Sequence, residues 1–206
     1  MHARVIVIAG PSGSGKSRLC RRLGLPVLNL DDFYKDGGDP TLPRLGSGLA
    51  DWDDPASWLP EAAVETVERL CREGRADVPI YDIAHDGRVG HRELLLDDAG
   101  FFLAEGIFAQ EIVAACRGRR LLADAICVRR NRLVTFWLRL TRDLREHRKP
   151  PLVLLRRGLH LLRAEPRVVA RAVALGCAPM TPERAYRRVR ALVGGGVTGS
   201  APRSPA

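Results

Sequence analysis

Short apolar runs alternate with amphipathic stretches along this chain of 206 residues. Runs this short are typical of buried strands in a parallel sheet, whereas apolar residues at helical spacing indicate helices. The predicted strands are residues 5–9, 27–30, 101–105 and 123–128, and the predicted helices between them are residues 16–23, 60–74 and 110–116. The alternation predicts an α/β fold in three α/β/α layers, with helices on both faces of a mostly parallel five-stranded sheet.

Two further regions do not follow this alternation. Residues 78–83 and 91–96 predict a small hairpin, with Asp86-Gly87 in the turn. After residue 130 the pattern is mainly helical, and the predicted helices are residues 131–146, 152–163, 167–175 and 182–192. Thr181 as N-cap and Pro182 in the first turn mark the start of the last one.

The domain prediction follows from these elements. We expect a single domain over residues 1–193, with an Arg-rich helical lid at about 132–150 and a helical C-terminal part at about 151–193. Residues 194–206 are almost entirely Gly, Ser, Pro, Thr and Ala, so a disordered tail is predicted there.

The octapeptide GPSGSGKS at residues 10–17 connects the first predicted strand to the first predicted helix. It matches G-x-x-x-x-G-K-[ST] in the strand, turn and helix context that a phosphate-binding loop requires. Its glycines allow backbone N–H groups to point at a phosphate, Lys16 can reach the β- and γ-phosphates, and the Ser17 hydroxyl can ligate Mg²⁺. We therefore predict ATP and Mg²⁺ as cofactors. The predicted nucleotide-binding residues are Gly10, Pro11, Ser12, Gly13, Ser14, Gly15, Lys16, Ser17 and Arg18.

Acidic residues stand at the carboxyl ends of two other predicted strands. Asp31 follows the second strand and Glu105 ends the strand at 101–105. Ligands of open α/β sheets bind outside these strand ends, so both acids are expected to face the same crevice as the loop. A carboxylate at Asp31, or at its neighbour Asp32, can accept the proton of an acceptor hydroxyl, an effect worth roughly 10²- to 10⁴-fold. Glu105 is predicted to help Ser17 hold Mg²⁺, directly or through water.

The net charge of +9 is unevenly distributed. Residues 1–115 contain 12 Lys and Arg against 19 Asp and Glu, whereas residues 116–206 contain 21 against 5. A cationic half can close over a triphosphate or attract nucleic acid. The long acidic loop between Asp31 and Asp54, together with the lack of interleaved basic and aromatic residues, speaks against nucleic acid as the partner.

Cysteine usage and apolar run lengths indicate the compartment. The five cysteines are scattered and form no C-x-x-C pair, which predicts reduced thiols in the cytoplasm rather than a disulfide frame or zinc site. No apolar run approaches the roughly 20 residues of a membrane span, and the start does not have the pattern of a signal peptide. We expect a cytoplasmic protein without a membrane partner, and the sequence leaves a homo-oligomer open.

Five further motifs resemble, in their order, those of the uridine kinase and phosphoribulokinase group. They are DDFY at 31–34, DDP at 53–55, PIYDIAH at 79–85, AEGI at 104–107 and RLTRD at 139–143, and the resemblance covers roughly residues 4–149. It implies that Asp31 is the base on the 5′-hydroxyl and that Asp53 binds ribose hydroxyls. It further implies that Tyr81 and His85 hold the nucleobase and that Tyr34 lines the acceptor pocket.

The same resemblance implies that Arg139 and Arg142 belong to a lid over substrate and phosphates. They lie on one helix face, and guanidinium groups can neutralise charge on a transferred phosphoryl group. Lys16, Asp31 and Arg142 are the predicted catalytic residues. The chain departs from the family pattern at Ile83 and Asp54, where the family has Phe and His, and the spacing to His85 is one residue shorter.

The predicted function is an ATP-dependent small-molecule kinase that transfers a γ-phosphate to the 5′-hydroxyl of uridine or cytidine. One alternative keeps the reaction and changes the acceptor to another hydroxylated metabolite, such as a sugar phosphate or a pantothenate-like compound. The alternative from another class is a nucleotide-dependent regulatory or nucleic-acid-binding ATPase that uses the cationic half.

Overall fold

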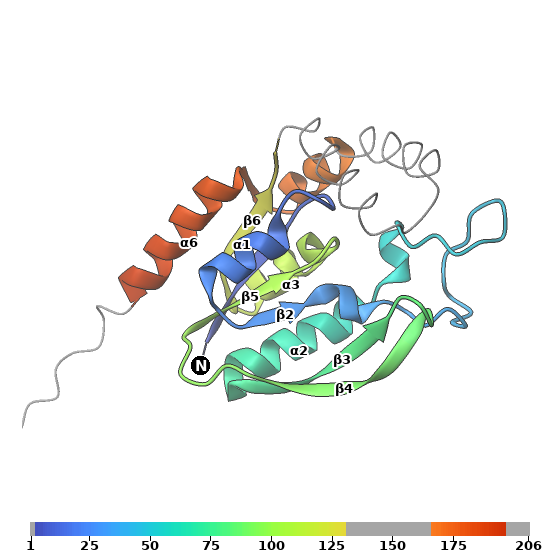
Figure 1. Cartoon of the computed structure of the whole chain (residues 1–206), viewed down its shortest axis with the longest axis horizontal. Helices are drawn as coiled ribbons and strands as arrows, with labels where there is room; N and C mark the ends of the chain where they lie inside the picture. The colour runs from blue at the N-terminus through green and yellow to red at the C-terminus, as the bar shows by residue number, and fades with distance from the viewer. Residues whose placement is uncertain (1–2, 131–165, 197–206) are drawn as a thin grey trace, which may run out of the picture.

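A parallel sheet of five strands forms the centre of the protein (Figure 1). The computed structural model describes residues 3–130 and 166–196. The strand order is β2-β5-β1-β6-β7, and every pairing is parallel. The strands are β1 (Arg4–Ala9), β2 (Val27–Asn29), β5 (Phe101–Glu105), β6 (Leu122–Val128) and β7 (Ala178–Met180). The predicted α/β class and the five-stranded sheet are confirmed.

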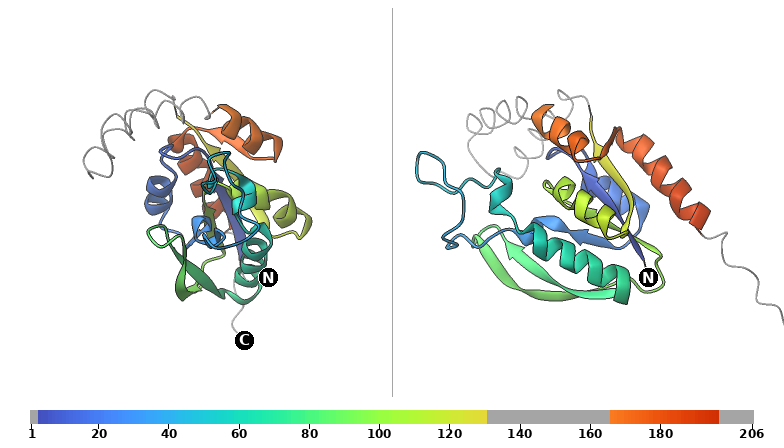
Figure 2. Two further views of the ribbon diagram at one scale, coloured as in Figure 1. Left: turned by 90° about the vertical axis from the view of Figure 1, so that its right-hand side faces the viewer. Right: turned by 180° about the vertical axis from the view of Figure 1, so that it is seen from behind.

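Helices cover both faces of this sheet (Figures 1 and 2). Val5 and Val7 of β1 pack with α2 (Pro60–Glu73) and α3 (Val113–Gly118), and the helix over residues 166–174 adds to the same cluster. Ile6 and Ile8 point to the opposite face, where α1 (Lys16–Leu23) and α6 (Pro182–Gly196) lie. The alternation of β1 side chains between two apolar clusters shows why the strand is apolar throughout.

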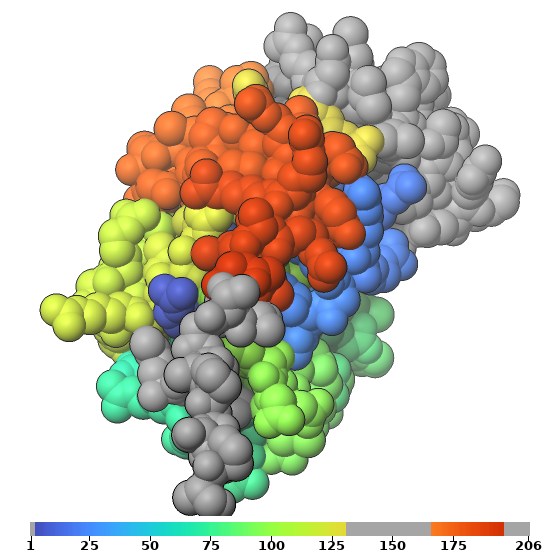
Figure 3. All heavy atoms as spheres, turned by 90° about the vertical axis from the view of Figure 1, so that its left-hand side faces the viewer, coloured from blue at the N-terminus to red at the C-terminus, as the bar shows by residue number. Residues whose placement is uncertain are grey.

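Helix α6 is held against α1 and the sheet by polar contacts at the rim of the core. Arg22 of α1 donates to both carboxylate oxygens of Glu183 at 2.6 and 3.3 Å and stacks on the ring of Tyr186. Arg188 donates to both oxygens of Asp124 on β6 at 2.6 and 2.9 Å. Figure 3 shows α6 packed beside α1 on this face.

A separate antiparallel ribbon lies beside α2, at the bottom of Figure 1. Its strands are β3 (Arg75–Asp82) and β4 (Gly87–Leu95), so the predicted hairpin is confirmed and is longer than predicted. Ala76 and Val78 of β3 point into the core under α2, while much of β4 is exposed. The ribbon also contacts the 3-10 turn η1 (Leu30–Phe33), which follows β2.

Several predicted boundaries move in the structure. The strand predicted at 27–30 ends at Asn29, because the Asn29 side chain accepts the N–H of Asp31 and starts η1. The helix predicted at 110–116 is a 3-10 turn, η3 (Ala109–Ile112), followed by α3, and the loop between η1 and α2 contains the short turn η2 (Pro55–Ser57).

At the C-terminal end, the start predicted for α6 is confirmed, but the tail prediction is wrong for residues 194–196, which continue the helix. The tail from 197, the helices predicted at 131–146 and 152–163, and the lid at about 132–150 lie outside the described residues. No helix in the described ranges is long and apolar enough to cross a membrane.

Candidate active site

The loop at residues 10–17 connects β1 to α1 and passes very close to the backbone at the end of β6. Gly10 has φ 137°, and a Cβ at this position would lie 2.3 Å from the carbonyl oxygen of Val128. Gly15 caps α1 in the left-handed conformation at φ 99°. The Ser14 hydroxyl is fully buried and has no hydrogen-bond partner among the described residues. Such a cradle with an unpaired buried hydroxyl fits a bound phosphate chain.

Lys16 is buried at the base of this loop. Its ammonium group donates to the carbonyl oxygens of Gly10 at 2.8 Å and Pro11 at 3.3 Å. Burial lowers the pKa of Lys16, and the carboxylates of Glu105 and Asp31 act in the opposite direction. Because both carboxylates act on the same amine, the structure gathers the loop lysine and the two predicted strand-end acids at one edge of the sheet.

Asp31 is positioned by the segment that follows β5. Its Oδ1 accepts the backbone N–H of Ile107 at 3.0 Å. A Cβ on Gly106 would lie 2.9 Å from the same oxygen, so the glycine allows the two segments to approach. The E-G-I motif therefore has a local physical role, because the glycine makes room for Asp31 and the next residue orients it. The rest of the Asp31 side chain remains exposed.

The neighbouring acid, Asp32, points in another direction. Burial raises its pKa, while the backbone of Tyr81, the side chain of Asn29 and the charge of Arg92 act against that rise. Two of these groups belong to the β3–β4 ribbon, so Asp32 faces the ribbon. Of the two adjacent acids, Asp31 is the one whose charge acts on Lys16.

Four aromatic rings gather beside Asp31. The Tyr34 ring lies 5.7 Å from Trp52, 5.9 Å from Tyr81 and 5.9 Å from Phe108, measured between ring centroids. The Tyr34 hydroxyl donates to the carbonyl oxygen of Trp52 at 3.2 Å. Burial, followed by the charges of Asp31 and Asp53, raises the pKa of Tyr34. Tyr34 and Tyr81 were predicted at the site, whereas Trp52 and Phe108 were missed, although both lie next to motifs the sequence offered.

Two other predicted substrate residues differ in their surroundings. Asp53 is exposed but close enough to Tyr34 for its charge to act on the phenol. His85 lies in the turn between β3 and β4, where its ring nitrogen pairs with Asp82 at 2.5 Å and its side chain is 75% exposed. The ring contacts of the aromatic cluster do not include His85. The pairing with Asp82 occupies one nitrogen of its ring.

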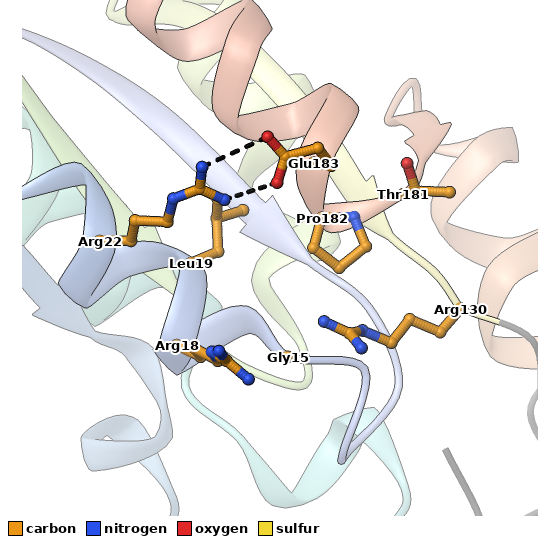
Figure 4. Close-up of a pocket in the computed structure, with 8 residues that line it drawn as sticks. All are labelled: Gly15, Arg18, Leu19, Arg22, Arg130, Thr181, Pro182 and Glu183. Atoms are coloured by element: carbon orange, nitrogen blue, oxygen red, sulfur yellow. Dashed lines mark hydrogen bonds and ion pairs between the residues drawn. The ribbon is translucent and has the colours of Figure 1, made fainter. Parts of the chain in front are cut away.

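A pocket of about 540 Å³ opens on the other side of the loop, between α1 and the start of α6 (Figure 4). Its lining residues are Gly15, Arg18, Leu19, Arg22, Arg130, Thr181, Pro182 and Glu183. Of these, Gly15 and Arg18 are predicted nucleotide-binding residues, and the sequence did not indicate that the other six line a pocket with them. Three arginines and one carboxylate give the pocket a cationic lining.

The remaining predicted site residues are the two magnesium ligands and the two lid arginines. Ser17 is exposed at the start of α1, and Glu105 is half-buried at the end of β5. A hydroxyl and a carboxylate are oxygen ligands of the kind Mg²⁺ prefers. The described residues contain no cluster of three or more His, Cys, Asp or Glu side chains that could bind a metal by themselves. Arg139 and Arg142 lie outside the described residues.

The sheet order and the cradle define a P-loop α/β fold, and comparisons with known proteins agree with it. No protein-family model matches the sequence. The chain is 28% identical over 112 residues to a uridine kinase of Saccharomyces cerevisiae, which covers 51% of this chain and 22% of that protein. It is 30% identical over 111 residues to the inorganic pyrophosphatase TTM1 of Arabidopsis thaliana, covering 51% of this chain and 16% of that protein.

A solved structure shares the fold over most of the chain. It is a protein of Silicibacter sp. TM1040 assigned as a fructose transport system kinase, with a TM-score of 0.61 and 19% identity over 82% of this chain and 85% of that chain. The match to a uridine kinase and this shared fold confirm the resemblance that the motifs indicated. The matched part spans about a fifth of the length of the curated relatives.

Proposed function

We propose that this protein is a P-loop kinase that transfers the γ-phosphate of ATP to a hydroxyl group of a small molecule. The observation that carries the proposal is that the buried loop lysine and the two strand-end carboxylates, Asp31 and Glu105, lie at the ends of the neighbouring strands β1, β2 and β5. A phosphate cradle alone is compatible with many activities. An acid fixed by a backbone N–H beside the cradle supplies the group that a phosphoryl acceptor needs.

Each residue of the loop has a defined task in this proposal. Backbone N–H groups of residues 10–17 hold the phosphates, and Lys16 exchanges its two carbonyl partners for phosphate oxygens. Ser17 and Glu105 hold Mg²⁺, which neutralises phosphate charge when bound. Asp31 orients the acceptor hydroxyl and accepts its proton. Arg139 and Arg142 are proposed to cover the transferred group, as the resemblance implies.

The residues around Asp31 support an acceptor that has both a flat ring and neighbouring hydroxyl groups. Tyr34, Trp52, Tyr81 and Phe108 supply apolar ring surface next to Asp31. A carboxylate such as Asp53 can accept hydrogen bonds from two vicinal hydroxyls. A pyrimidine ribonucleoside phosphorylated on its 5′-hydroxyl combines both features, so uridine and cytidine are the proposed acceptors.

A second acceptor class is favoured by a specific observation. His85 is 75% exposed and paired with Asp82, rather than packed on the aromatic rings, so one residue proposed to hold the base is turned outward. This favours another hydroxylated metabolite, such as a sugar phosphate or a pantothenate-like compound. ATP consumption measured against nucleosides and these metabolites separates the two classes. Salt-sensitive binding of nucleic acid without any small-molecule phosphorylation would favour the regulatory ATPase instead.

The cellular setting is also a proposal. All five cysteines are free and buried, which supports a reducing cytoplasm, and we propose that residues 1–193 act as one domain. No membrane partner is proposed, and a homo-oligomer is compatible with the activity.

The decisive experiment compares the two adjacent acids. Asp31→Asn is expected to lower kcat by at least about 100-fold with little change in the Kd for ATP, because the carboxylate acts on the acceptor. Asp32→Asn has nearly the same volume and charge change, but it alters a side chain that faces the ribbon, so it is expected to keep most of the activity. Phosphorylation of the preferred acceptor and ATP binding by calorimetry are the measurements. Near wild-type kcat in Asp31→Asn contradicts the assignment of the base.

Lys16→Ala tests the donor side. It is expected to abolish phosphoryl transfer, because the variant lacks the ammonium group that binds the β- and γ-phosphates. Unchanged activity in this variant would rule out the whole proposal.

A further inference from the structure

Arg130 starts at the same edge of the sheet as the phosphate loop. It follows β6 after a single residue, and the end of β6 lies beside the end of β1, with Cys127 opposite Ala9. Figure 4 shows the Arg130 side chain running from β6 toward Gly15. Its place therefore depends on a core strand of the sheet.

The guanidinium group lies next to the loop at Gly15. A Cβ on Gly15 would lie 3.5 Å from Nε, 3.6 Å from Nη2 and 3.8 Å from Cζ of Arg130. These distances place the guanidinium group directly beside Gly15, in ordinary van der Waals range of the space that a side chain would fill. Gly15 also caps α1, so the charge is held at the helix terminus that binds anions.

The charge of Arg130 has no partner in the described part of the chain. Its Nε is buried and unbonded there, and no described carboxylate forms an ion pair with it. The one carboxylate lining the same pocket, Glu183, is already held by Arg22 at 2.6 and 3.3 Å. A buried donor that lacks an acceptor costs free energy, so the arrangement indicates a ligand that supplies one.

We propose that Arg130 binds phosphate oxygens of the donor nucleotide on the loop, a role that rests on the kinase function proposed above. The ligand class is a polyphosphate chain, because a guanidinium fork matches phosphate oxygens and the neighbouring loop presents N–H groups to the same anion. Because Arg130 follows a strand of the central sheet, its position depends on the core of the fold. We therefore expect it to contribute to binding of the donor before phosphoryl transfer. The pocket beyond it, toward Pro182 and Glu183, then receives the nucleoside part.

The test measures binding of ATP and of inorganic triphosphate to the full chain by calorimetry, together with the melting temperature without ligand. Arg130→Ala is expected to weaken both ligands by about 10- to 100-fold, the usual effect of losing hydrogen bonds to a charged group. Arg130→Lys is expected to recover part of the affinity, because it keeps the charge but loses the fork. Arg129→Ala removes an exposed arginine from the adjacent position and is expected to stay within about twofold of wild type.

Four results would contradict the proposal in distinct ways. If Arg130→Ala and Arg130→Lys bind both ligands like wild type while Lys16→Ala binds neither, Arg130 has no part in donor binding and the kinase proposal stands. If only ATP is weakened, Arg130 contacts the nucleoside and the phosphate assignment is wrong. If the wild-type chain binds neither ligand, the kinase proposal itself fails. A lower melting temperature in Arg130→Ala with unchanged affinity in Arg130→Lys indicates a structural role and also contradicts the proposal.

Discussion

Individual residues at the loop are constrained by backbone geometry more than by their own chemistry. Gly10 takes a φ of 137° against the carbonyl of Val128, and Gly106 lets Asp31 reach the N–H of Ile107. At both glycines two chain segments lie so close together that a Cβ would not fit between them. The chemistry of Lys16 and Asp31 therefore depends on neighbours that have no side chain.

Gly10→Ala tests this constraint. The added Cβ would lie 2.3 Å from a backbone oxygen, in a φ region that L residues rarely adopt. We expect a loss of about 2–4 kcal/mol in the free energy of unfolding and loss of ATP binding. Gly38→Ala is the control, because a Cβ there meets nothing within 4 Å. Denaturant unfolding and calorimetry provide the readout, and equal stability of the two variants would show that the loop can rearrange.

At the scale of elements, the β3–β4 ribbon is joined to the segment after η1 by a charged contact. Arg88 of β4 donates from its backbone N–H to Oδ1 of Asp36 at 2.9 Å and from Nη2 to Oδ2 at 2.8 Å. The N–H of Gly37 donates to the carbonyl of Asp86 at 2.6 Å. These contacts hold the two segments that carry Tyr34 and Tyr81, so the ribbon supports the aromatic side of the site.

This contact predicts a pH dependence of stability. Arg88 holds the pKa of Asp36 below its usual value, so the ionised carboxylate stabilises the fold above its unfolded pKa of about 3.9. The stabilisation is lost as the pH falls through the lower, folded pKa. Both side chains are more than 40% exposed, so the effect is expected to be below about 1 kcal/mol.

The measurement compares melting temperatures of wild type and Asp36→Asn. Wild type is expected to melt at a higher temperature at pH 7, and the difference is expected to shrink below pH of about 4. Glu65→Gln, which removes an exposed acid of α2 that forms no ion pair among the described residues, controls for general loss of an acid. A difference between wild type and Asp36→Asn that does not change with pH would contradict this account.

At the scale of the whole molecule, the site is assembled from segments far apart in the sequence. The loop follows β1, Asp31 follows β2, Glu105 ends β5, Arg130 follows β6, and Pro182 follows β7. Parallel strands place all five ends at one edge of the sheet. A ligand that binds at this edge lies beside the ends of strands from the whole sheet, so binding is expected to stabilise the fold as a unit.

MgATP is therefore expected to raise the melting temperature of the whole chain in one transition. At a free concentration of 100 times its Kd, the ligand adds about 2.7 kcal/mol to the free energy of unfolding. Lys16→Ala is expected to show no such shift. Differential scanning calorimetry at several nucleotide concentrations measures it, and a wild-type melting temperature independent of MgATP contradicts nucleotide binding at this edge.

Local patterns in the sequence were sufficient to predict most of the strands and helices of the fold. The apolar strands and the capped helices follow from interactions within a few residues of the chain, and the glycine-rich loop is recognisable from its motif alone. The short strand β7 was missed, because Ala178–Met180 is brief and contains Pro179. Proline lacks the N–H that an inner strand needs, and β7 tolerates it at the edge of the sheet.

The sequence by itself determined the α/β class, the phosphate loop and the acids at the strand ends, since these follow from periodicity and from glycine geometry. Only the tertiary structure decided which acid faces Lys16, which rings surround Tyr34 and where Arg130 lies. The reason is physical: these contacts join residues from different strands, and their distances depend on strand register and on how the ribbon and α6 pack against the sheet.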